Sequence, residues 1–296
     1  MKYKIVSDSS CNVLSGEDPC FASVPMKIIA QEEYVDGPGL DVEQMVEDLK
    51  NHKGKSGSSC PNVGEWLEAF GDAELVFGTT ISSALSGSYS AACHAADTYM
   101  EEHPERKVYI LDSRSTGPEQ AMLNDKLRQL LEQGLNPETV LEQAKTYQDH
   151  VHTLFCLESL NNLARNGRVN PAVAKLAGVL GIRVCGEGKN GEVTPVHKAR
   201  GPKKAIQTLV DMIKERGFYD GALLRVAHCF AKEQALALRD EIKKRMPVCK
   251  VVLLVDEKSD AALAAAVRQA KKDGLADNFI YGSVSPDYLA AVMDAL

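Results

Sequence analysis

The sequence predicts an α/β protein with two domains. The N-terminal domain is expected to have a mainly parallel sheet with flanking helices, and the C-terminal domain an α+β arrangement with a mixed or antiparallel sheet. Three observations support this prediction. The 296 residues suffice for two domains. The composition, 44% hydrophobic and 25% charged, is typical of a globular protein. Apolar strand-like runs alternate with amphipathic helical patterns through the first half.

The N-terminal domain is expected over residues 1–150. Its predicted strands cover 3–7, 22–30, 74–80 and 107–113. Its predicted helices cover 41–52, 63–71, 88–102, 118–133 and 137–148. A parallel sheet of this kind has helices on both faces, and ligands bind beyond the carboxyl ends of its strands. The loops that follow the strands are therefore where we expect the site.

The C-terminal domain is expected over residues 151–296, after a boundary at the stretch DHVHT. A strand-like TLFCLE leads into a helix, the basic turn ARNGRV and an apolar helix near 171–179. Two short strands follow, separated by GKNGEV, whose Asn190-Gly191 pair is a strong hairpin signal. The remaining predictions are helices at 201–216, 231–245 and 259–273 and strands at 221–229 and 249–255.

Composition and charge exclude several classes of protein. The net charge of −7 argues against a non-specific nucleic-acid binder, which is usually basic. We expect no membrane span, because no run of 18 apolar residues occurs, and a cytoplasmic location, because the N-terminus lacks signal-peptide features. The eight cysteines show neither C-x-x-C nor zinc-finger spacing, so we expect reduced thiols and no metal.

Two hydroxyl-rich loops carry the most informative chemistry. They are GKSGSSCPNVGEW at 54–66 and TTISSALSGSYS at 79–90. In the first, Asn62 and Glu65 have capping-box spacing, which predicts a helix start. Each helix start offers unpaired N–H groups and a partial positive charge, and serine hydroxyls add further donors. The loops could hold a carboxylate or phosphate, although helix capping alone also explains their serines.

Known nucleotide-binding and nucleophile motifs match this sequence poorly. The GKS at 54–56 lacks the glycine that a P-loop needs, since Leu49 occupies that position. No G-x-G-x-x-G occurs in a strand-to-helix turn, and no G-x-S-x-G elbow is present. His94 lies off the helical face of Ser88, so it does not pair with Ser88 as a base. Asp8 and Asp36 could hold a cation or act as a base, but Asp8 in SDSS also fits a turn cap.

The second half of the chain adds a group of basic residues. Arg168 in NGRV and Arg200 in KARGPKKA follow turn signals, so they could point into a cleft or toward a partner. A solvated surface explains the group equally well. The group comprises Arg165, Arg168, Lys198, Arg200, Lys203 and Lys204.

Read in order, several stretches resemble the DegV family of fatty-acid-binding proteins over about residues 1–245. TTISSALSGSYSAA is similar to its Ser-x-Leu-Ser-Gly-Thr segment, and SSCPNVGEW to its Thr-Ser-Gln-Pro-Ser loop, with Ser58 in place of threonine and Cys60 in place of glutamine. The other matching stretches are IVSDSSCNV, VPMKIIAQEEYVDG, LDSRSTG, LNNLARNGRV and VTPVHKARGPKKA.

The resemblance implies a DegV-like fold that holds a long-chain fatty acid in the cleft between two domains. The tail would run along 171–184, PAVAKLAGVLGIRV, although a packed core also explains that run. The implied carboxylate-binding residues are Ser58, Ser59, Ser86, Gly87 and Ser88.

Some members of this bacterial family act in phospholipid metabolism, where they present the lipid to a separate ATP-dependent kinase subunit. The resemblance therefore implies a non-catalytic carrier with no cofactor, no metal and no catalytic residue. Arg168, Arg200 and His228 are the implied partner or head-group contacts.

The end of the chain departs from the family pattern, since it lacks the usual Gly-x-His-x-Gly-Pro-Gly loop and has no histidine after His228. This puts one head-group contact and competence as a kinase partner in doubt. The alternative function is a phosphotransferase of the dihydroxyacetone-kinase-like class acting on a small hydroxylated substrate, with Asp8 and Asp36 in its site. A regulator that binds another small anion is a third interpretation.

Overall fold

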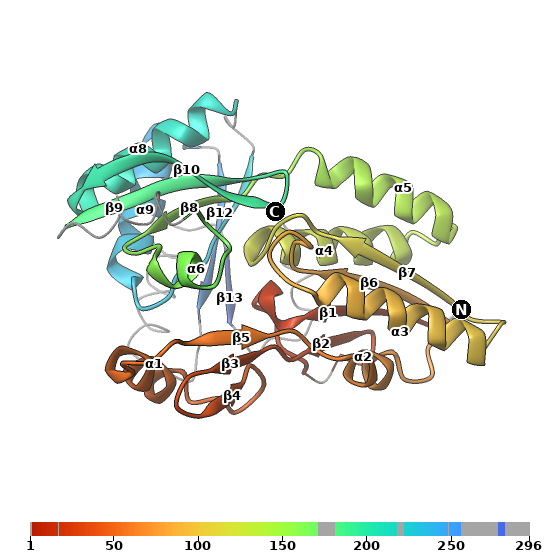
Figure 1. Cartoon of the computed structure of the whole chain (residues 1–296). Helices are drawn as coiled ribbons and strands as arrows, with labels where there is room; N and C mark the ends of the chain where they lie inside the picture. The colour runs from red at the N-terminus through yellow and green to blue at the C-terminus, as the bar shows by residue number, and fades with distance from the viewer. Residues whose placement is uncertain are drawn as a thin grey trace. The chain divides into compact units, whose positions relative to one another are not determined.

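The computed structural model describes residues 2–16, 18–170, 181–217, 222–247, 249–255 and 278–281 (Figure 1). The chain divides into two compact units. Unit 1 comprises Met1–Thr153, Asn161–Pro171 and Gly188–Val193, and unit 2 comprises Leu154–Leu160, Ala172–Glu187 and Thr194–Leu296. The sequence analysis placed a boundary near residue 150. It did not anticipate that two later segments return to unit 1.

Unit 1 is built on a four-stranded parallel sheet with the strand order β2-β1-β6-β7. Every residue of β6 is buried, as expected for a strand in the middle of a sheet that is covered on both faces. This confirms the α/β class predicted from the alternating pattern. The strands are β1 (Tyr3–Asp8), β2 (Phe21–Val24), β6 (Leu75–Thr80) and β7 (Lys107–Asp112).

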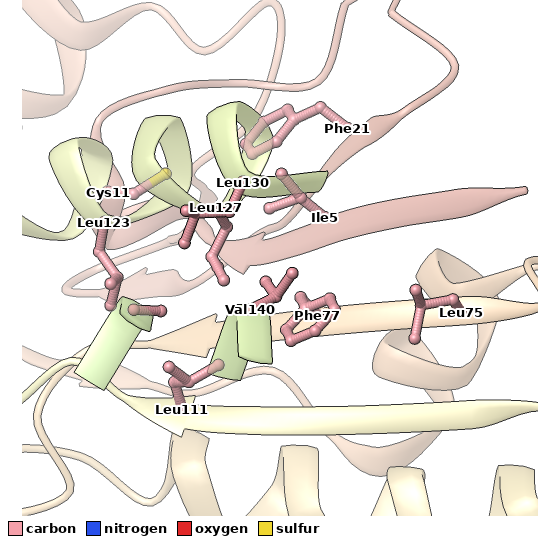
Figure 2. Packing of buried hydrophobic residues seen from close by; sticks show 11 residues of the cluster. Ile5, Cys11, Phe21, Leu75, Phe77, Leu111, Leu123, Leu127, Leu130 and Val140 are labelled. Carbon is pink, nitrogen blue, oxygen red and sulfur yellow. The ribbon is translucent and has the colours of Figure 1, made fainter. Parts of the chain in front are cut away.

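Helices cover the two faces of this sheet because strand side chains alternate between them. Ile5 and Phe77 pack with α4 and α5, as Figure 2 shows for α4 residues such as Leu127. Val6 and Val76 pack with α2 and α3 on the other face. The helices are α2 (Val63–Phe70), α3 (Ser88–Glu102), α4 (Pro118–Glu132) and α5 (Pro137–Gln148).

The single strand predicted over 22–30 is wrong, because it is two strands in different sheets. β2 ends at Val24, and β3 (Lys27–Ile29) lies between β4 (Glu33–Val35) and β5 (Gly57–Ser59) in a small antiparallel sheet. Pro25 separates the two strands, and it has no N–H with which to continue a ladder. Between β4 and β5 runs α1 (Val42–Asn51).

In the described part of unit 2 the strands form two three-stranded sheets, and antiparallel pairing in one of them confirms the predicted α+β arrangement. The first has the order β10-β9-β8, with β8 and β9 antiparallel, and the second is a parallel sheet with the order β11-β12-β13. The strands are β8 (Leu154–Leu157), β9 (Ile182–Lys189), β10 (Glu192–Arg200), β11 (Leu223–Val226), β12 (Lys250–Val255) and β13 (Asn278–Tyr281).

The predicted hairpin signal is confirmed, since Asn190 and Gly191 connect β9 to β10 with positive φ angles of 53° and 82°. Helices α8 (Gly201–Glu215) and α9 (Lys232–Arg245) match their predicted positions within two residues. The short helix α6 (Asn161–Arg165) belongs to unit 1. The helices predicted near 171–179 and over 259–273 lie outside the described residues. Among the helices that are described, none is long and apolar enough to cross a membrane.

Candidate functional site

The second serine loop connects the end of β6 to the start of α3. Its turn is closed by the backbone N–H groups of Leu85 and Ser86, which both donate to the Ser82 carbonyl, at 3.0 and 3.1 Å. The Ser86 hydroxyl oxygen accepts a hydrogen bond from the Ser88 backbone N–H at 3.3 Å. This bond uses a lone pair of Ser86, so its O–H proton stays available for an acceptor at the start of the helix.

Ser88 plays a different part from the one expected. Its side chain is fully buried, and its hydroxyl donates to Oδ2 of Asp8 at 2.6 Å. A hydroxyl has one proton, so a bond donated to Asp8 leaves none for a ligand carboxylate. The structure therefore places Ser88 in a buried network beneath the helix start.

Asp8 is the centre of that network, which we call the Asp8 cluster. Its carboxylate is fully buried at the end of β1 and accepts four hydrogen bonds. Besides Ser88, the donors are the Ser10 hydroxyl at 2.5 Å, the Ile81 backbone N–H at 2.9 Å and the Gln120 side-chain amide at 3.0 Å. These bonds stabilise the buried charge and join β1 to the loop before α3 and to the first turns of α3 and α4.

The expected pairing of Asp8 and Asp36 as cation ligands finds no support in this geometry. Asp36 accepts a hydrogen bond from the Ser9 hydroxyl at 2.6 Å, and burial, with a smaller contribution from Asp8, raises the pKa of its carboxyl. Both carboxylates are thus used by protein donors. Within the described part of the chain, no three His, Cys, Asp or Glu side chains are grouped so as to hold a metal ion.

The first serine loop forms an edge strand. In β5, Ser58 pairs with Ile28 and Ser59 with Lys27. Because successive side chains of a strand point to opposite faces, the hydroxyls of Ser58 and Ser59 diverge. Ser58 is exposed, and Ser59 is half-buried. The two serines therefore cannot both face one small group from the same side of the strand.

The predicted capping box that follows this loop is confirmed. Asn62 Oδ1 accepts from the Glu65 N–H at 3.0 Å, and the Glu65 carboxylate accepts from the Asn62 N–H at 2.7 Å. The helix that starts there is anchored by Trp66 and Phe70, both fully buried. The loop is thereby held between a sheet edge and a core helix.

The two serine loops lie side by side. A Cβ atom built on Gly87 would lie 3.5 Å from the Cys60 Sγ, so the start of α3 lies close to the residue directly after Ser59. Distant in sequence, the two loops therefore meet within unit 1.

A third segment braces both loops. Asn166 donates from Nδ2 to the Ser56 carbonyl at 3.0 Å. Arg168 donates from Nε to the Leu85 carbonyl at 3.0 Å and from Nη1 to the Asn166 carbonyl at 2.6 Å. We call Asn166, Gly167 and Arg168 the NGR brace. Arg168 was expected to face a partner or ligand, whereas its described bonds hold the loop before Ser86.

Sequence analysis missed both Asn166 and a contact from the β9–β10 hairpin. The Ser82 hydroxyl donates to the Gly191 carbonyl at 2.7 Å, and a Cβ on Gly191 would lie 2.5 Å from the Ser82 Oγ. The Asn-Gly pairs in NGRV and KNGEV were visible as turns. Nothing in their pattern indicates which loop they contact, because these contacts span about a hundred residues of sequence.

The remaining site candidates lie in unit 2. Arg200 is exposed at the N-cap of α8, with extended backbone. His228 is exposed after β11, and partial desolvation together with Lys232 lowers its pKa. The run 171–184, expected to line a tail channel, lies outside the described residues as far as Leu180, and much of the divergent C-terminal region also lies outside them.

Comparison with known proteins gives concordant matches. The family model described as "Uncharacterised protein, DegV family" matches residues 2–255. A DegV domain-containing protein of Streptococcus pneumoniae strain R6 is 34% identical over 260 residues, which cover 86% of this chain and 92% of that protein.

Two solved structures are similar over most of their length. A DegV family protein from Eubacterium eligens, loaded with heptadecanoic acid, has a TM-score of 0.81 and 37% identity, covering 85% of this chain and 91% of that one. The Fatty Acid Kinase (Fak) B3 protein of Streptococcus pneumoniae, loaded with linoleic acid, has a TM-score of 0.81 and 34% identity, covering 86% and 92%.

Proposed function

Because this chain belongs to the DegV family, we propose that it binds a long-chain fatty acid whose carboxylate is held by the two serine loops of unit 1. The observation that carries the proposal is the close approach of the two loops at Gly87 and Cys60, together with the hydrogen bonds that Asn166 and Arg168 donate to these loops. The fatty acids in the two similar solved structures support the choice of ligand class.

The donors that we assign to the carboxylate are neutral. Ser86 keeps its hydroxyl proton, and Gly87 lies at the start of a 15-residue helix, whose first N–H groups have no intrahelical acceptor. Strand β5 contributes one hydroxyl, from Ser58 or Ser59, since the two diverge. Ser88 acts indirectly, because its bond to Asp8 fixes the helix start.

The free energy of binding is divided between the tail and the head group. Burying a sixteen-carbon tail at about 0.8 kcal/mol per CH₂ gives on the order of 12 kcal/mol before entropy costs. Burying a carboxylate without partners costs several kcal/mol, and three or four donors offset that cost. The tail therefore supplies affinity, and the serine loops supply orientation.

We further propose that the protein is a carrier rather than an enzyme. It would present the lipid to a separate ATP-dependent kinase subunit and use no cofactor. Arg200 and His228, exposed in unit 2, and Arg168 are the proposed partner or head-group contacts. The cysteines form no disulfide bond among the residues that the structure describes, which fits a reducing compartment and supports a cytoplasmic location.

Mass spectrometry of the protein purified from bacteria tests the ligand. We expect a co-purifying acyl chain, and we expect Ser58→Ala, Ser59→Ala and Ser86→Ala combined to lose most of it. Ser90→Ala is the matched control, since Ser90 is an exposed serine on the same helix. Full retention in the triple variant, or a phosphorylated small molecule in the site, would contradict the proposal. The single variants show which serine of β5 contributes.

A further inference from the structure

Two cysteines lie directly opposite each other in unit 2. Cys156 of β8 pairs with Cys185 of β9 in the antiparallel register. One rung beyond that register, the Gly188 N–H donates to the Thr153 carbonyl at 2.9 Å. Hydrogen-bonded and non-hydrogen-bonded pairs alternate along an antiparallel ladder, so the cysteines, three rungs away, form a non-hydrogen-bonded pair, with Cα atoms about 4.5 Å apart.

This spacing lies within the range that a disulfide accepts, about 4.4–6.8 Å between Cα atoms. Both cysteines are in the thiol form, and the Cys185 thiol donates a weak hydrogen bond to the Ala205 carbonyl at 3.8 Å. The side chains point to the same face of the sheet, where Cys185 packs against Ala205 and Met212 of α8. The two sulfur atoms thus need no backbone rearrangement to meet.

The two thiols differ in access and reactivity. Cys156 is half-buried, whereas Cys185 is fully buried. The adjacent Cys185 side chain, and next the nearby Arg183 guanidinium, lower the pKa of Cys156 against the opposing effect of burial. The adjacent Cys156 side chain, followed by burial, raises the pKa of Cys185. Because the thiolate is the reactive form, Cys156 is placed to react first and Cys185 to resolve the product.

We propose that Cys156 and Cys185 form a reversible disulfide, which makes this strand pair an oxidation site that responds to peroxide. The Cys156 thiolate attacks one oxygen of hydrogen peroxide and forms a sulfenic acid, releasing hydroxide. The Cys185 thiolate then attacks that sulfur, forms the S–S bond and displaces a second hydroxide. With the two thiol protons, the products are one disulfide and two water molecules.

The Cys156–Cys185 disulfide would hold the edge strand β8 in place. β8 is short, four residues, and has β9 as its one neighbour in the sheet order β10-β9-β8. A covalent link at its third residue would hold β8 in register where a few hydrogen bonds hold it now. This inference does not depend on the proposed lipid function.

Peptide mapping of the oxidised protein tests the site directly. Trypsin separates the two cysteines, since Cys156 lies in the peptide 146–165 and Cys185 in the peptide 184–189. After treatment with hydrogen peroxide, alkylation of remaining thiols and digestion without reductant, we expect these peptides to disappear and one linked peptide to replace them. Dithiothreitol should restore both.

Cys11 is the internal control, because it is fully buried and burial raises its pKa to about 12. It should remain alkylatable only after unfolding and should form no linked peptide. Cys156→Ser and Cys185→Ser should each abolish the linked peptide. Recovery of both wild-type peptides in unlinked form, or linkage of Cys156 to the exposed Cys229 instead, would overturn the proposal without requiring any variant to fold.

Discussion

The Asp8 cluster and the two serine loops contain the same kind of side chain but use it differently. In the Asp8 cluster, Ser10 and Ser88 donate their protons to a carboxylate that belongs to the protein. A few residues away, Ser86 accepts from a backbone N–H and keeps its proton. The difference shows that one hydroxyl loop can combine a finished internal network with open donors for a ligand.

Burial explains why the hydroxyls of the Asp8 cluster and the donors of the two serine loops have different roles. Asp8 is fully buried, so its charge needs every donor that the fold provides. Ser86 is only half-buried, and Gly87 and Ser58 are exposed. Donors at that depth can remain without a protein acceptor because water or a ligand satisfies them. The buried network therefore serves stability, whereas the outer donors are free for the binding role that we propose for them.

The largest expected effect comes from removing the acceptor of the buried network. Asp8→Ala leaves the Ser88 hydroxyl and the Ile81 N–H without their acceptor, and each buried unsatisfied donor costs about 1–3 kcal/mol. Ser10 and Gln120 lose a bond to Asp8 but keep other acceptors, Gln120 Oε1 and the Ser7 hydroxyl. We expect a loss of about 3–5 kcal/mol in the free energy of unfolding, measured by urea denaturation.

Asp72→Asn is the control for this variant, because Asp72 forms an exposed ion pair with Lys2 and its loss should change stability little. If Asp8→Ala and Asp72→Asn proved equally stable, the four bonds to Asp8 would not hold the sheet end together. The Asp8 cluster would then contribute no more to stability than an exposed ion pair, and burial would not distinguish it from the serine loops.

The next largest effect on stability is expected from Ser88→Ala, which we compare with Ser86→Ala. Ser88→Ala removes a hydrogen bond to a buried charge, so we expect a loss of about 1.5–3 kcal/mol in stability. Ser86→Ala should leave stability nearly unchanged and lower lipid retention more than Ser88→Ala does. Urea denaturation and mass spectrometry of bound lipid measure the two properties on the same preparations. The reverse order of effects would mean that the roles of the two serines are exchanged.

The smallest effect concerns Glu119, a second carboxylate held by hydroxyls. Ser115 and Thr153 donate to its Oε2 at 2.9 and 2.6 Å, yet burial has the larger effect and raises the pKa of this carboxyl from its ordinary value. Between the unfolded and folded pKa values the folded state binds more protons, so Glu119's contribution to stability falls as pH rises through that window.

Glu119→Gln has no such titration and should not show that fall. Urea denaturation of both proteins from about pH 4 to pH 8 measures the difference. We expect wild type to lose stability relative to the variant with rising pH. A difference that stays constant over this range would show that hydrogen bonds from Ser115 and Thr153 cancel the effect of burial.

Local sequence patterns predicted the elements that local physics controls. Period-2 alternation and uninterrupted apolar runs gave β1, β6 and β7, and the Asn62–Glu65 spacing gave the start of α2. The error at 22–30 came from reading through Pro25. Short edge strands such as β5 were missed because GSS has no strand pattern, and pairing with β3 alone makes it a strand.

By itself, the sequence determined the α/β class, the capped helix starts and the two serine loops, because these depend on neighbours within a few residues. The tertiary structure decided which serine meets Asp8, that Ser58 and Ser59 diverge, and that Asn166 and Arg168 brace both loops. A hydroxyl can donate to any acceptor that folding brings within about 3 Å. Its partner is therefore set by contacts between distant segments, which no local pattern encodes.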